Sequence, residues 1–312
     1  MSIVRTAVIG VGYLGRFHAQ KFASIEAAEL IGICDIDDQT GRAVADECSS
    51  EFFADYRDLA SQVDAVVIAA DTAVHFTIAK FFLENDIHVF VEKPMTSTSS
   101  EGQELTTLAE ARHLKLQVGH IERFNPALLS ARDRLTGVQF IECHRLAPFK
   151  GRSSDVNVVL DLMIHDLDVI LSLVDGRPSL VSAVGISVLT RSVDIANARI
   201  EFDTGAIANV TASRVSTSTQ RKFRIFQNKQ YLSIDFDRGE VQLVSSAAAS
   251  ENEPSLQQDS WSLEKGDALA AEVSSFIDAI VSDRPCEVTG RDGVAALELA
   301  ESIIADIDRR AF

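Results

Sequence analysis

A glycine pattern near the start of the chain constrains the fold more than any other feature. Gly10-Val-Gly12-Tyr-Leu-Gly15 follows an apolar strand expected at Val4–Ile9 and opens a helix expected to reach about Phe22. The first glycine allows a tight turn, the second lets the backbone approach a pyrophosphate, and the third permits close packing of helix on strand. The pyrophosphate would lie at the helix N-terminus, where backbone N–H groups favour an anion. The pattern therefore predicts a βαβ unit that binds a dinucleotide.

An acidic residue follows at the spacing that such a unit requires. Asp35 ends the next expected strand, Leu30–Cys34, and lies 20 residues after Gly15. A carboxylate there accepts hydrogen bonds from the adenosine ribose hydroxyls and repels the 2′-phosphate of NADP. Two further aspartates follow, and along the sequence no arginine stands nearby until Arg42. We therefore expect NAD as the cofactor; the alternative role of Asp35 is to cap the next helix.

Strands and helices alternate through the first 120 residues. Further apolar strands are expected at residues 65–70, 89–91 and 116–118, with a helix between each pair. Thr98-Ser-Ser-Glu101 has the form of a capping box, in which a hydroxyl and a carboxylate satisfy the first N–H groups of a helix. Near-continuous apolar strands separated by helices indicate a parallel sheet that is covered on both faces.

The pattern changes after Phe124. Longer strands follow from Val138, with hairpin signals at Asp203-Thr-Gly205 and Asp237-Arg-Gly239. A polar surface loop is expected at residues 245–260, and helices are expected at 158–173, 268–281 and 294–307.

These elements predict an α/β fold with two domains. Residues 1–120 would form a Rossmann domain that binds NAD. Residues 121–312 would form a substrate-binding and oligomerisation domain, an α/β domain built on an open, mainly antiparallel sheet.

The composition limits the partners of the chain. Its 312 residues contain 29 Lys and Arg against 46 Asp and Glu, and the net charge of −17 repels nucleic-acid phosphates and anionic lipid. No apolar run approaches the roughly 20 residues of a membrane span, and the start of the chain lacks a signal-peptide pattern. The four cysteines are scattered without a C-x-x-C pair, so we expect a reducing, cytoplasmic location.

Further motifs appear in order along the chain. Glu92-Lys93-Pro94 follows the strand at 89–91, at the sheet edge where parallel sheets bind ligands. With GVGYLGRFHA at 10–19, Thr72 and His75, VGHIERFNP at 118–126 and DLMIH at 161–165, it resembles the Gfo/Idh/MocA family of sugar oxidoreductases over the whole chain. We assign to the cofactor site Gly10, Gly12, Tyr13, Leu14, Gly15, Asp35, Ile36, Asp71, Thr72, His75, Glu92 and Lys93.

The residue types also suggest a chemistry. Oxidation of a secondary alcohol moves a hydride to nicotinamide while a base takes the hydroxyl proton, and His, with an ordinary pKa of about 6.5, is a natural base. His165 follows Asp161 by four residues on an expected helix, so both side chains share one face. Lys93 would bring a cation to the developing alkoxide or serve as an acid–base group itself. The resemblance implies catalytic roles for Lys93, Asp161 and His165.

Other interpretations of these residues remain open. His165 alone could be an ordinary helix histidine. A metal site at His165, Asp166 and Asp168 is disfavoured because adjacent helix positions point in different directions, so we expect no metal. The chain also departs from the family at Asp71, where proline is frequent, and at Asn157, where glycine is usual. Asp71 could cap the following helix or contact the cofactor, and Asn157 approaches the substrate.

One subgroup of the family shows a more specific resemblance. HRLAPF at 144–149, the segment from Asp155 to Asp168 and the stretch at 119–126 are similar to bacterial enzymes that oxidise the 3-hydroxyl of UDP-N-acetylglucosamine. Arg123 and Asn125 would then lie near the sugar or its diphosphate, unless Arg123 pairs with a surface carboxylate. We expect substrate contacts from Lys93, Arg123, Asn125, Asn157, Asp161 and His165.

The family also contains other activities. The alternatives are a dehydrogenase of a free sugar or inositol, an NAD-dependent glycosidase, and a dinucleotide-binding regulator without catalysis. The joint presence of Lys93, Asp161 and His165 disfavours the regulator. The resemblance further implies a homodimer or homotetramer.

Overall fold

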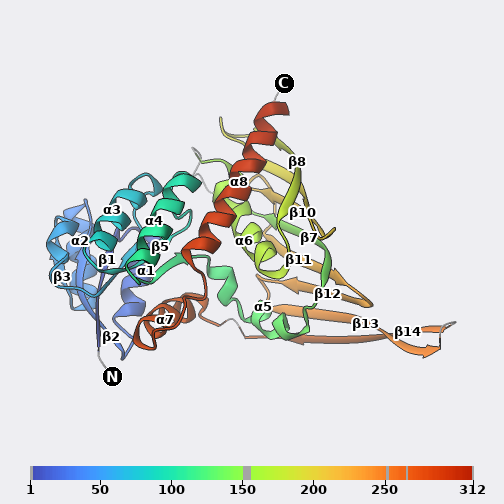
Figure 1. Cartoon of the computed structure of the whole chain (residues 1–312), viewed down its shortest axis with the longest axis horizontal. Coiled ribbons are helices and arrows are strands. Elements are labelled where there is room, and N and C mark those ends of the chain that lie inside the picture. The colour runs from blue at the N-terminus through green and yellow to red at the C-terminus, as the bar shows by residue number, and fades with distance from the viewer. Residues whose placement is uncertain (1–2, 150–155, 251–252, 265, 311–312) are drawn as a thin grey trace. The chain divides into compact units, whose positions relative to one another are not determined.

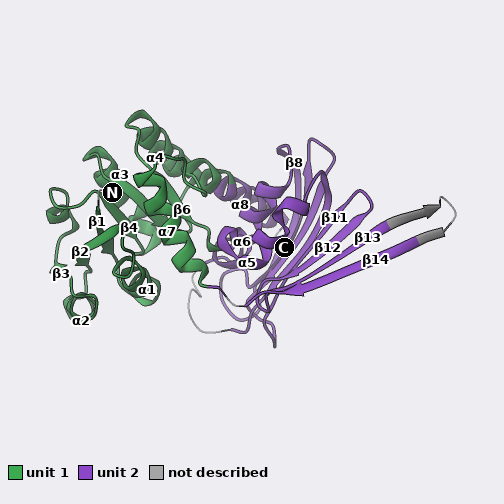
Figure 2. Ribbon diagram, turned by 90° about the horizontal axis from the view of Figure 1, so that it is seen from below, with its two compact units in different colours: residues 1–121, 267–295 green, residues 122–266, 296–312 purple. Residues whose placement is uncertain are grey.

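The computed structural model describes residues 3–149, 156–250, 253–264 and 266–310 (Figure 1). Asp155, at the start of one segment used above, lies outside them. The chain divides into two compact units: unit 1 comprises residues 1–121 and 267–295, and unit 2 comprises 122–266 and 296–312 (Figure 2). The expected domain boundary at residue 120 thus lies next to the first boundary between the units, after residue 121. The assignment of all of 121–312 to one domain is corrected, because residues 267–295 belong to unit 1.

The correction has a physical cause in the helix α7 (Ala268–Val281). Its apolar side chains belong to the same buried cluster as Phe22 and Phe90 of the N-terminal residues. The ring centroids of Phe90 and Phe276 lie 5.8 Å apart, edge to face. Periodicity along the chain predicts such a helix but not the sheet on which it packs.

Unit 1 contains a six-stranded parallel sheet in the order β3-β2-β1-β4-β5-β6. The strands are β1 Val4–Ile9, β2 Ala28–Cys34, β3 Glu51–Phe53, β4 Ala65–Ile68, β5 His88–Glu92 and β6 Leu116–Gly119. Every residue of β4 and β6 is buried, as expected for a sheet covered on both faces. The strand order reverses between β1 and β4, which is where ligands bind in such sheets. The sequence did not predict β3, which is only three residues long.

The helices of unit 1 lie close to their expected positions. The capping box is present, with Thr98 accepting from the backbone N–H of Glu101 and the Glu101 carboxylate accepting from that of Thr98. The helices are α1 Tyr13–Phe22, α2 Asp38–Cys48, the 3₁₀ turn η1 Tyr56–Leu59, α3 Thr72–Glu84, α4 Ser99–Ala111, α7, and the start of α8 Gly290–Arg310. Among the described residues, no helix combines the length and the apolar character needed to span a bilayer.

Unit 2 contains an eight-stranded sheet in the order β14-β13-β12-β11-β7-β10-β9-β8. Only β10 and β7 are parallel among its described pairs, so the sheet is mainly antiparallel, as expected. The strands are β7 Val138–Leu146, β8 Pro178–Ile186, β9 Ile195–Phe202, β10 Ile207–Ser213, β11 Gln220–Gln227, β12 Gln230–Asp235, β13 Glu240–Ser250 and β14 Glu253–Ser262.

The prediction of a surface loop at residues 245–260 is wrong. Apart from residues 251–252, which are outside the described ranges, these residues belong to β13 and β14 at the edge of the sheet. Residues 255–260 are all exposed, so β14 lacks the alternation of apolar and polar residues that marks a half-buried strand.

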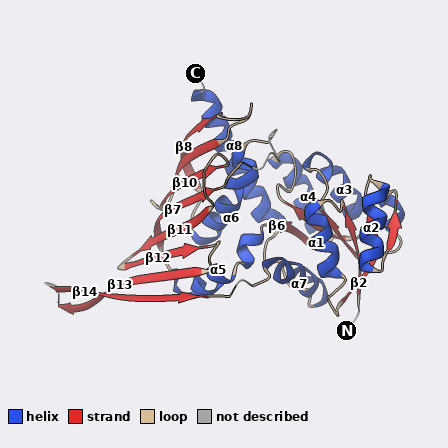
Figure 3. Ribbon diagram, turned by 180° about the vertical axis from the view of Figure 1, so that it is seen from behind, coloured by secondary structure: helices blue, strands red, loops and turns tan. Residues whose placement is uncertain are grey.

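The helices of unit 2 follow one face of this sheet (Figure 3). They are the end of the 3₁₀ turn η2 Ile121–Phe124, α5 Pro126–Ala131, η3 Arg132–Arg134, a π-helical turn Val159–Met163, α6 Ile164–Leu173 and the end of α8. Met163, Leu167 and Ile170 share one buried cluster with strand residues such as Ile141 and Phe223. The expected helix at 158–173 is therefore present, but it begins with a π turn.

Candidate active site

The glycine loop of unit 1 has the geometry that the sequence predicts. Gly10 has a φ of +80°, and a Cβ at this position would lie 2.6 Å from the Ala70 backbone. A Cβ on Gly15 would collide with the carbonyl oxygen of Gly10, so the start of α1 can approach β1 only because this residue is glycine. A Cβ on Gly12 would have no atom within 4 Å. The loop thus leaves open space at the N-terminus of α1.

That space belongs to a cavity of about 730 Å³, a volume typical of small-molecule sites. Six of the twelve residues assigned to the cofactor line it: Gly10, Gly12, Tyr13, Asp35, Ile36 and Asp71. The other six do not: Leu14, Gly15, Thr72, His75, Glu92 and Lys93. The cavity therefore lies at the carboxyl ends of β1, β2 and β4.

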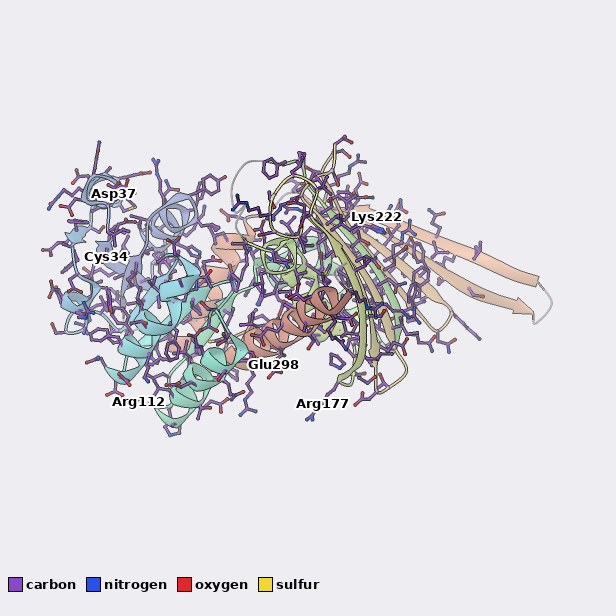
Figure 4. All side chains as sticks on the ribbon, turned by 90° about the horizontal axis from the view of Figure 1, so that it is seen from above. Cys34, Asp37, Arg112, Arg177, Lys222 and Glu298 are labelled. Atoms are coloured by element: carbon purple, nitrogen blue, oxygen red, sulfur yellow. The ribbon has the colours of Figure 1, made fainter. Side chains whose placement is uncertain are left out.

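Asp35 is held by the backbone rather than by a cation. Its Oδ2 accepts from the N–H of Val11 at 2.7 Å, and its Oδ1 accepts from the N–H of Asp37 at 2.8 Å. These bonds orient the carboxylate at the end of β2, and each oxygen keeps a further lone pair for a ribose hydroxyl. The helix is capped instead by Asp37, which accepts from Thr40 N–H at 2.9 Å. Cys34 and Asp37 are labelled at this end of β2 in Figure 4.

Cys34 also lines the cavity. Burial, with the nearby negative charge of Asp35, raises the pKa of its thiol to about 12. The group is therefore neutral near pH 7, which confirms its interpretation as a small core residue.

Among the cavity residues that the sequence did not assign to the cofactor are Asp55, Tyr56 and Arg57. They follow β3, which pairs with β2 so that Phe53 lies beside Cys34. The available signal was the short apolar run Phe52-Phe53-Ala54 followed by Asp55, because this fold also places an acidic residue at the end of β2.

Asp71 is the N-cap residue of α3, yet its side chain makes no capping hydrogen bond. The side chain is exposed and lines the cavity. Of the two roles considered above, contact with a ligand is the one that this geometry favours.

Glu92 pairs with a buried histidine. Its Oε1 accepts from Nε2 of His18 at 2.7 Å, and its Oε2 accepts from the backbone N–H of Lys93 at 3.1 Å. Burial raises the pKa of the Glu92 carboxyl, but the hydrogen bond from His18 and the charge of Lys93 outweigh burial and leave that pKa below its ordinary value. A Cβ on Gly119 would lie 2.8 Å from this carboxylate. Glu92 therefore fixes the backbone just before Lys93.

His75 lies on the other side of the same motif. Its Nδ1 is 3.0 Å from the carbonyl oxygen of Pro94, and its Nε2 is 2.9 Å from that of Ala70. Burial lowers the pKa of His75, so the ring is neutral near pH 7 and donates to one carbonyl at a time. The Lys93–Pro94 peptide bond is cis. His75 thus supports the loop that carries Lys93 and does not line the cavity.

In unit 2, Asp161 lies in the π turn and His165 in the first turn of α6. Both side chains are half-buried. π turns are rare and are frequent at functional sites. The two residues assigned to catalysis thus occur one helical turn apart, on a segment with an uncommon backbone.

The same segment is held by buried ion pairs. Asp166 accepts from Nε and Nη2 of Arg145 at 3.0 and 2.8 Å, and Glu122 accepts from Nη1 of Arg145 at 2.9 Å. Burial lowers the pKa of Arg145, but the charges of Asp166 and Glu122 outweigh it and raise the pKa. Burial raises the pKa of Glu122, but the charges of Arg145 and Arg221 leave it below its ordinary value. Burial also raises the pKa of Asp166, and the charge and hydrogen bonds of Arg145 only partly oppose this rise. In this Arg145 cluster, Arg145 and Glu122 are therefore charged near pH 7.

A second buried pair joins α6 to η2. Asp168 accepts from Nε and Nη2 of Arg123 at 2.7 and 2.9 Å, and the two side chains are 1% and 8% exposed, respectively. The alternative expected from the sequence is that Arg123 pairs with a surface carboxylate. Its partner is indeed a carboxylate, Asp168, but this carboxylate is buried. A direct contact between Arg123 and a substrate phosphate stays a prediction.

Asn125 and Asn157 both cap helical segments. Asn125 Oδ1 accepts from Ala127 N–H at 3.0 Å, and Asn157 Oδ1 accepts from Val159 N–H at 2.9 Å. Their predicted substrate contacts also stay predictions.

A third ion pair supports the start of the π turn. The buried carboxylate of Asp194 accepts from the N–H groups of Val188, Leu189 and Thr190, at 2.8, 2.6 and 2.8 Å, and from Nε of Arg214 at 2.8 Å. Nη1 of Arg214 donates to the carbonyl oxygen of Val156 at 2.7 Å. Burial raises the pKa of Asp194, but these donors outweigh it and hold the pKa well below its ordinary value.

Unit 1 fits an NAD molecule on its own geometry. Gly12 leaves room for a pyrophosphate at the N-terminus of α1, and Asp35 presents oriented carboxylate oxygens at the end of the neighbouring strand. The cavity that joins them has a suitable volume. A dinucleotide requires this arrangement, with its pyrophosphate at the helix N-terminus and its adenosine ribose at the acidic end of the strand.

Comparison with known proteins agrees with this geometry. Residues 4–120 match the oxidoreductase family with an NAD-binding Rossmann fold, and residues 142–233 match the GFO/IDH/MocA C-terminal domain. The chain is 39% identical, over 98% of its length and 99% of the relative, to the UDP-N-acetylglucosamine 3-dehydrogenase of Acidithiobacillus ferrooxidans. It is 32% identical, over 68% of each chain, to a scyllo-inositol 2-dehydrogenase (NAD(+)) of Bacillus subtilis.

Solved structures show the same fold. A structure of the Acidithiobacillus ferrooxidans UDP-N-acetylglucosamine 3-dehydrogenase matches with a TM-score of 0.93 and 37% identity, covering 99% of both chains. A scyllo-inositol dehydrogenase from Lactobacillus casei with bound NAD(H) and scyllo-inositol matches with a TM-score of 0.83 and 19% identity, covering 99% of this chain and 98% of that one. The expected fold and cofactor are thereby confirmed, and the chain belongs to the Gfo/Idh/MocA family of NAD-binding oxidoreductases.

Proposed function

We propose that the protein oxidises the 3-hydroxyl of UDP-N-acetylglucosamine, or of a closely related UDP-sugar, with NAD. The observation that carries this proposal is the 39% identity, over nearly the full length of both chains, to an enzyme named for that reaction. The inositol dehydrogenases with full-length similarity are more distant, at 24% identity for the one from Rhizobium meliloti.

In the proposed reaction the carbon that bears the hydroxyl becomes a ketone. NAD, when bound, accepts the hydride. His165 takes the hydroxyl proton, Asp161 orients the imidazole or holds a neighbouring hydroxyl, and the Lys93 ammonium stabilises the developing alkoxide. The His18–Glu92 pair and His75 support this role, because they fix the backbone on either side of Lys93.

The test is a panel of substrates followed by nicotinamide absorbance. We expect UDP-N-acetylglucosamine to give the highest kcat/KM, with one NADH formed for each 3-keto sugar. Free N-acetylglucosamine lacks the diphosphate, and the loss of that remote binding energy lowers kcat as well as affinity. Comparable efficiency on free sugars or inositols would remove the nucleotide-sugar assignment. Release of sugar without net NADH would identify a glycosidase instead.

The cofactor preference is part of the same proposal. Asp35 should make the protein bind NAD much more tightly than NADP, because its carboxylate repels a 2′-phosphate. Equal dissociation constants for the two cofactors, measured by calorimetry, would contradict this role of Asp35.

We also propose that the protein is a cytoplasmic homo-oligomer. No described helix covers the second face of the unit 2 sheet, on which Lys222 lies (Figure 4). This face carries two apolar groups, which strands β10 and β9 separate. In the first, the Phe226 ring centroid lies 5.4 Å from that of Phe140 and 4.8 Å from that of Tyr231, and in the second Val184 and Ile186 are 53% and 56% exposed. A second copy would bury these apolar side chains. Light scattering should give a dimer or tetramer, and Phe226→Asp should shift it toward the monomer.

A further inference from the structure

Two neighbouring strands of unit 1 end in aspartates that line one cavity. β2 and β3 are parallel, with Cys34 beside Phe53. Asp35 and Asp55 therefore follow the ends of adjacent strands, and both line the 730 Å³ cavity. The end of the cavity expected to hold the adenosine ribose is thus acidic at the ends of two strands, and Asp35 belongs to only one of them.

The same end of the cavity also contains a cation. Arg57 lines the cavity, and its Nη1 donates to both oxygens of Asp55, at 3.2 and 3.1 Å. The backbone N–H of Arg57 donates to Asp55 Oδ1 at 2.9 Å, and its guanidinium carbon lies 4.7 Å from the centroid of the Tyr56 ring. The Arg57 side chain is 59% exposed, so solvent or a ligand can reach it.

The arginine that the sequence singled out lies elsewhere. Arg42 is directed over the Phe52 ring, 4.5 Å from its centroid, and is 3.4 Å from Asp38. It does not line the cavity. Arg57 is therefore the arginine that lines the cavity. It lies in the turn after β3, whereas Arg42 lies in the helix after β2.

NADP differs from NAD by a phosphate on the adenosine ribose. A carboxylate at this place repels that phosphate, and an arginine nearby accommodates it. A guanidinium also binds phosphate oxygens through paired N–H donors. An arginine beside an NAD ribose would therefore weaken the discrimination that Asp35 provides, unless something occupies its donors and cancels its charge.

We propose that Asp55 is a second determinant of NAD specificity, which holds Arg57 and thereby masks a latent site for a 2′-phosphate. Asp55 neutralises the guanidinium and occupies Nη1, so the effect of Asp55 on the phosphate acts through Arg57. The inference rests on NAD binding by unit 1 and is independent of the sugar that is oxidised.

The test measures dissociation constants for NAD and NADP by calorimetry without any sugar. Asp55→Asn is the informative variant, because an amide oxygen can still accept from the N–H of Arg57 while the charge is removed. We expect it to lower the ratio of the NADP to the NAD dissociation constant about tenfold, equal to ~1.4 kcal/mol. The effect should be larger in Asp35→Ser/Asp55→Asn than in Asp35→Ser alone.

Two controls make the result specific. Asp58→Asn removes an exposed charge from the same 3₁₀ turn, outside the cavity lining, and should leave the ratio unchanged. Asp55→Asn/Arg57→Gln should restore the wild-type ratio, because the arginine that binds the phosphate is gone. An unchanged ratio in folded Asp55→Asn, or a gain that persists without Arg57, would overturn the proposal. Neither result would bear on the sugar, so failure here is distinct from failure of the proposed reaction.

Discussion

The two units hold their functional residues by different means. At the cofactor cavity of unit 1 the backbone positions the functional residues: Asp35 accepts two N–H groups, and the shape of the loop depends on Gly10 and Gly15. In unit 2 the segment with Asp161 and His165 is fixed by side chains, through the buried pairs of Asp166 with Arg145 and Asp168 with Arg123.

This difference teaches where a sequence is informative. Backbone positioning leaves a local motif, since glycines and strand ends must occur at fixed spacings. Buried ion pairs join residues far apart in sequence, so no local pattern records them. Single substitutions should therefore have different effects in the two units.

The largest effect is expected in unit 1. Lys93→Ala should abolish turnover while calorimetry still detects NAD binding, because the glycine loop and Asp35 remain to bind the cofactor. Lys80→Ala is the control, since Lys80 is an exposed partner of Glu104. Appreciable NADH formation by Lys93→Ala would show that the lysine is not essential.

The next effect is expected in unit 2. His165→Ala should lower kcat by about a hundred- to ten-thousand-fold, the usual contribution of a positioned acid–base group. The fold should persist, because the α6 ion pairs involve other residues. His113→Ala, at an exposed position after α4, should keep the wild-type rate. A loss for His165→Ala below tenfold would contradict its catalytic role.

The third prediction compares the ion pairs of the two units directly. Arg145→Met removes the cation paired with the buried Asp166 and the nearer of the two cations beside Glu122, and it should lower the free energy of unfolding by about 3–5 kcal/mol. Arg291→Met removes an exposed pair with Glu110 in unit 1 and should leave the free energy of unfolding nearly unchanged, because solvent screens such a pair. Urea titration followed by circular dichroism measures both values. Equal losses of unfolding free energy would mean that the buried pairs of unit 2 stabilise the protein no more than the exposed pair of unit 1.

The smallest effect concerns Asp194 and depends on pH. Asp194→Asn should cost about 1–3 kcal/mol at pH 7, because an amide is a weaker acceptor for Arg214 and the loop N–H groups. The folded pKa of Asp194 is depressed, so its stabilisation is present above the unfolded value of about 3.9 and is lost as pH falls through the folded pKa.

The stability difference between wild type and Asp194→Asn should therefore shrink below about pH 4. Thermal midpoints of both proteins at pH 7, 4 and 3 provide the measurement. A difference that grows in acid would show that the carboxylate is not stabilised by its buried donors.

The sequence predicted the fold wherever apolar periodicity was strong. β1, α1 and the capping box at Thr98 lie where the pattern indicated. β3 was missed because three residues provide no periodicity, and the β13–β14 hairpin was missed because much of it is polar and exposed. The return of α7 to unit 1 depends on the packing of Phe276 against Phe90, which no local pattern contains.

The candidate site divides in the same way. The roles of Gly10, Gly12 and Gly15 could be predicted because each follows from backbone space. Arg57 and the partner of Arg123 could not, since both depend on which strands and helices become neighbours.

Unit 1 is formed by two separate segments of the chain, and this has a consequence for its synthesis. Residues 122–266 separate its two segments, so 266 − 121 = 145 residues must be made after the last strand before α7 can follow. At roughly 5–20 residues per second this takes about 7–30 s. During that interval the apolar side chains that share a buried cluster with α7, among them Phe22 and Phe90, lack the part of the cluster that α7 provides. A fragment ending at residue 121 would expose that surface for its whole lifetime, and we expect it to aggregate where the complete chain does not.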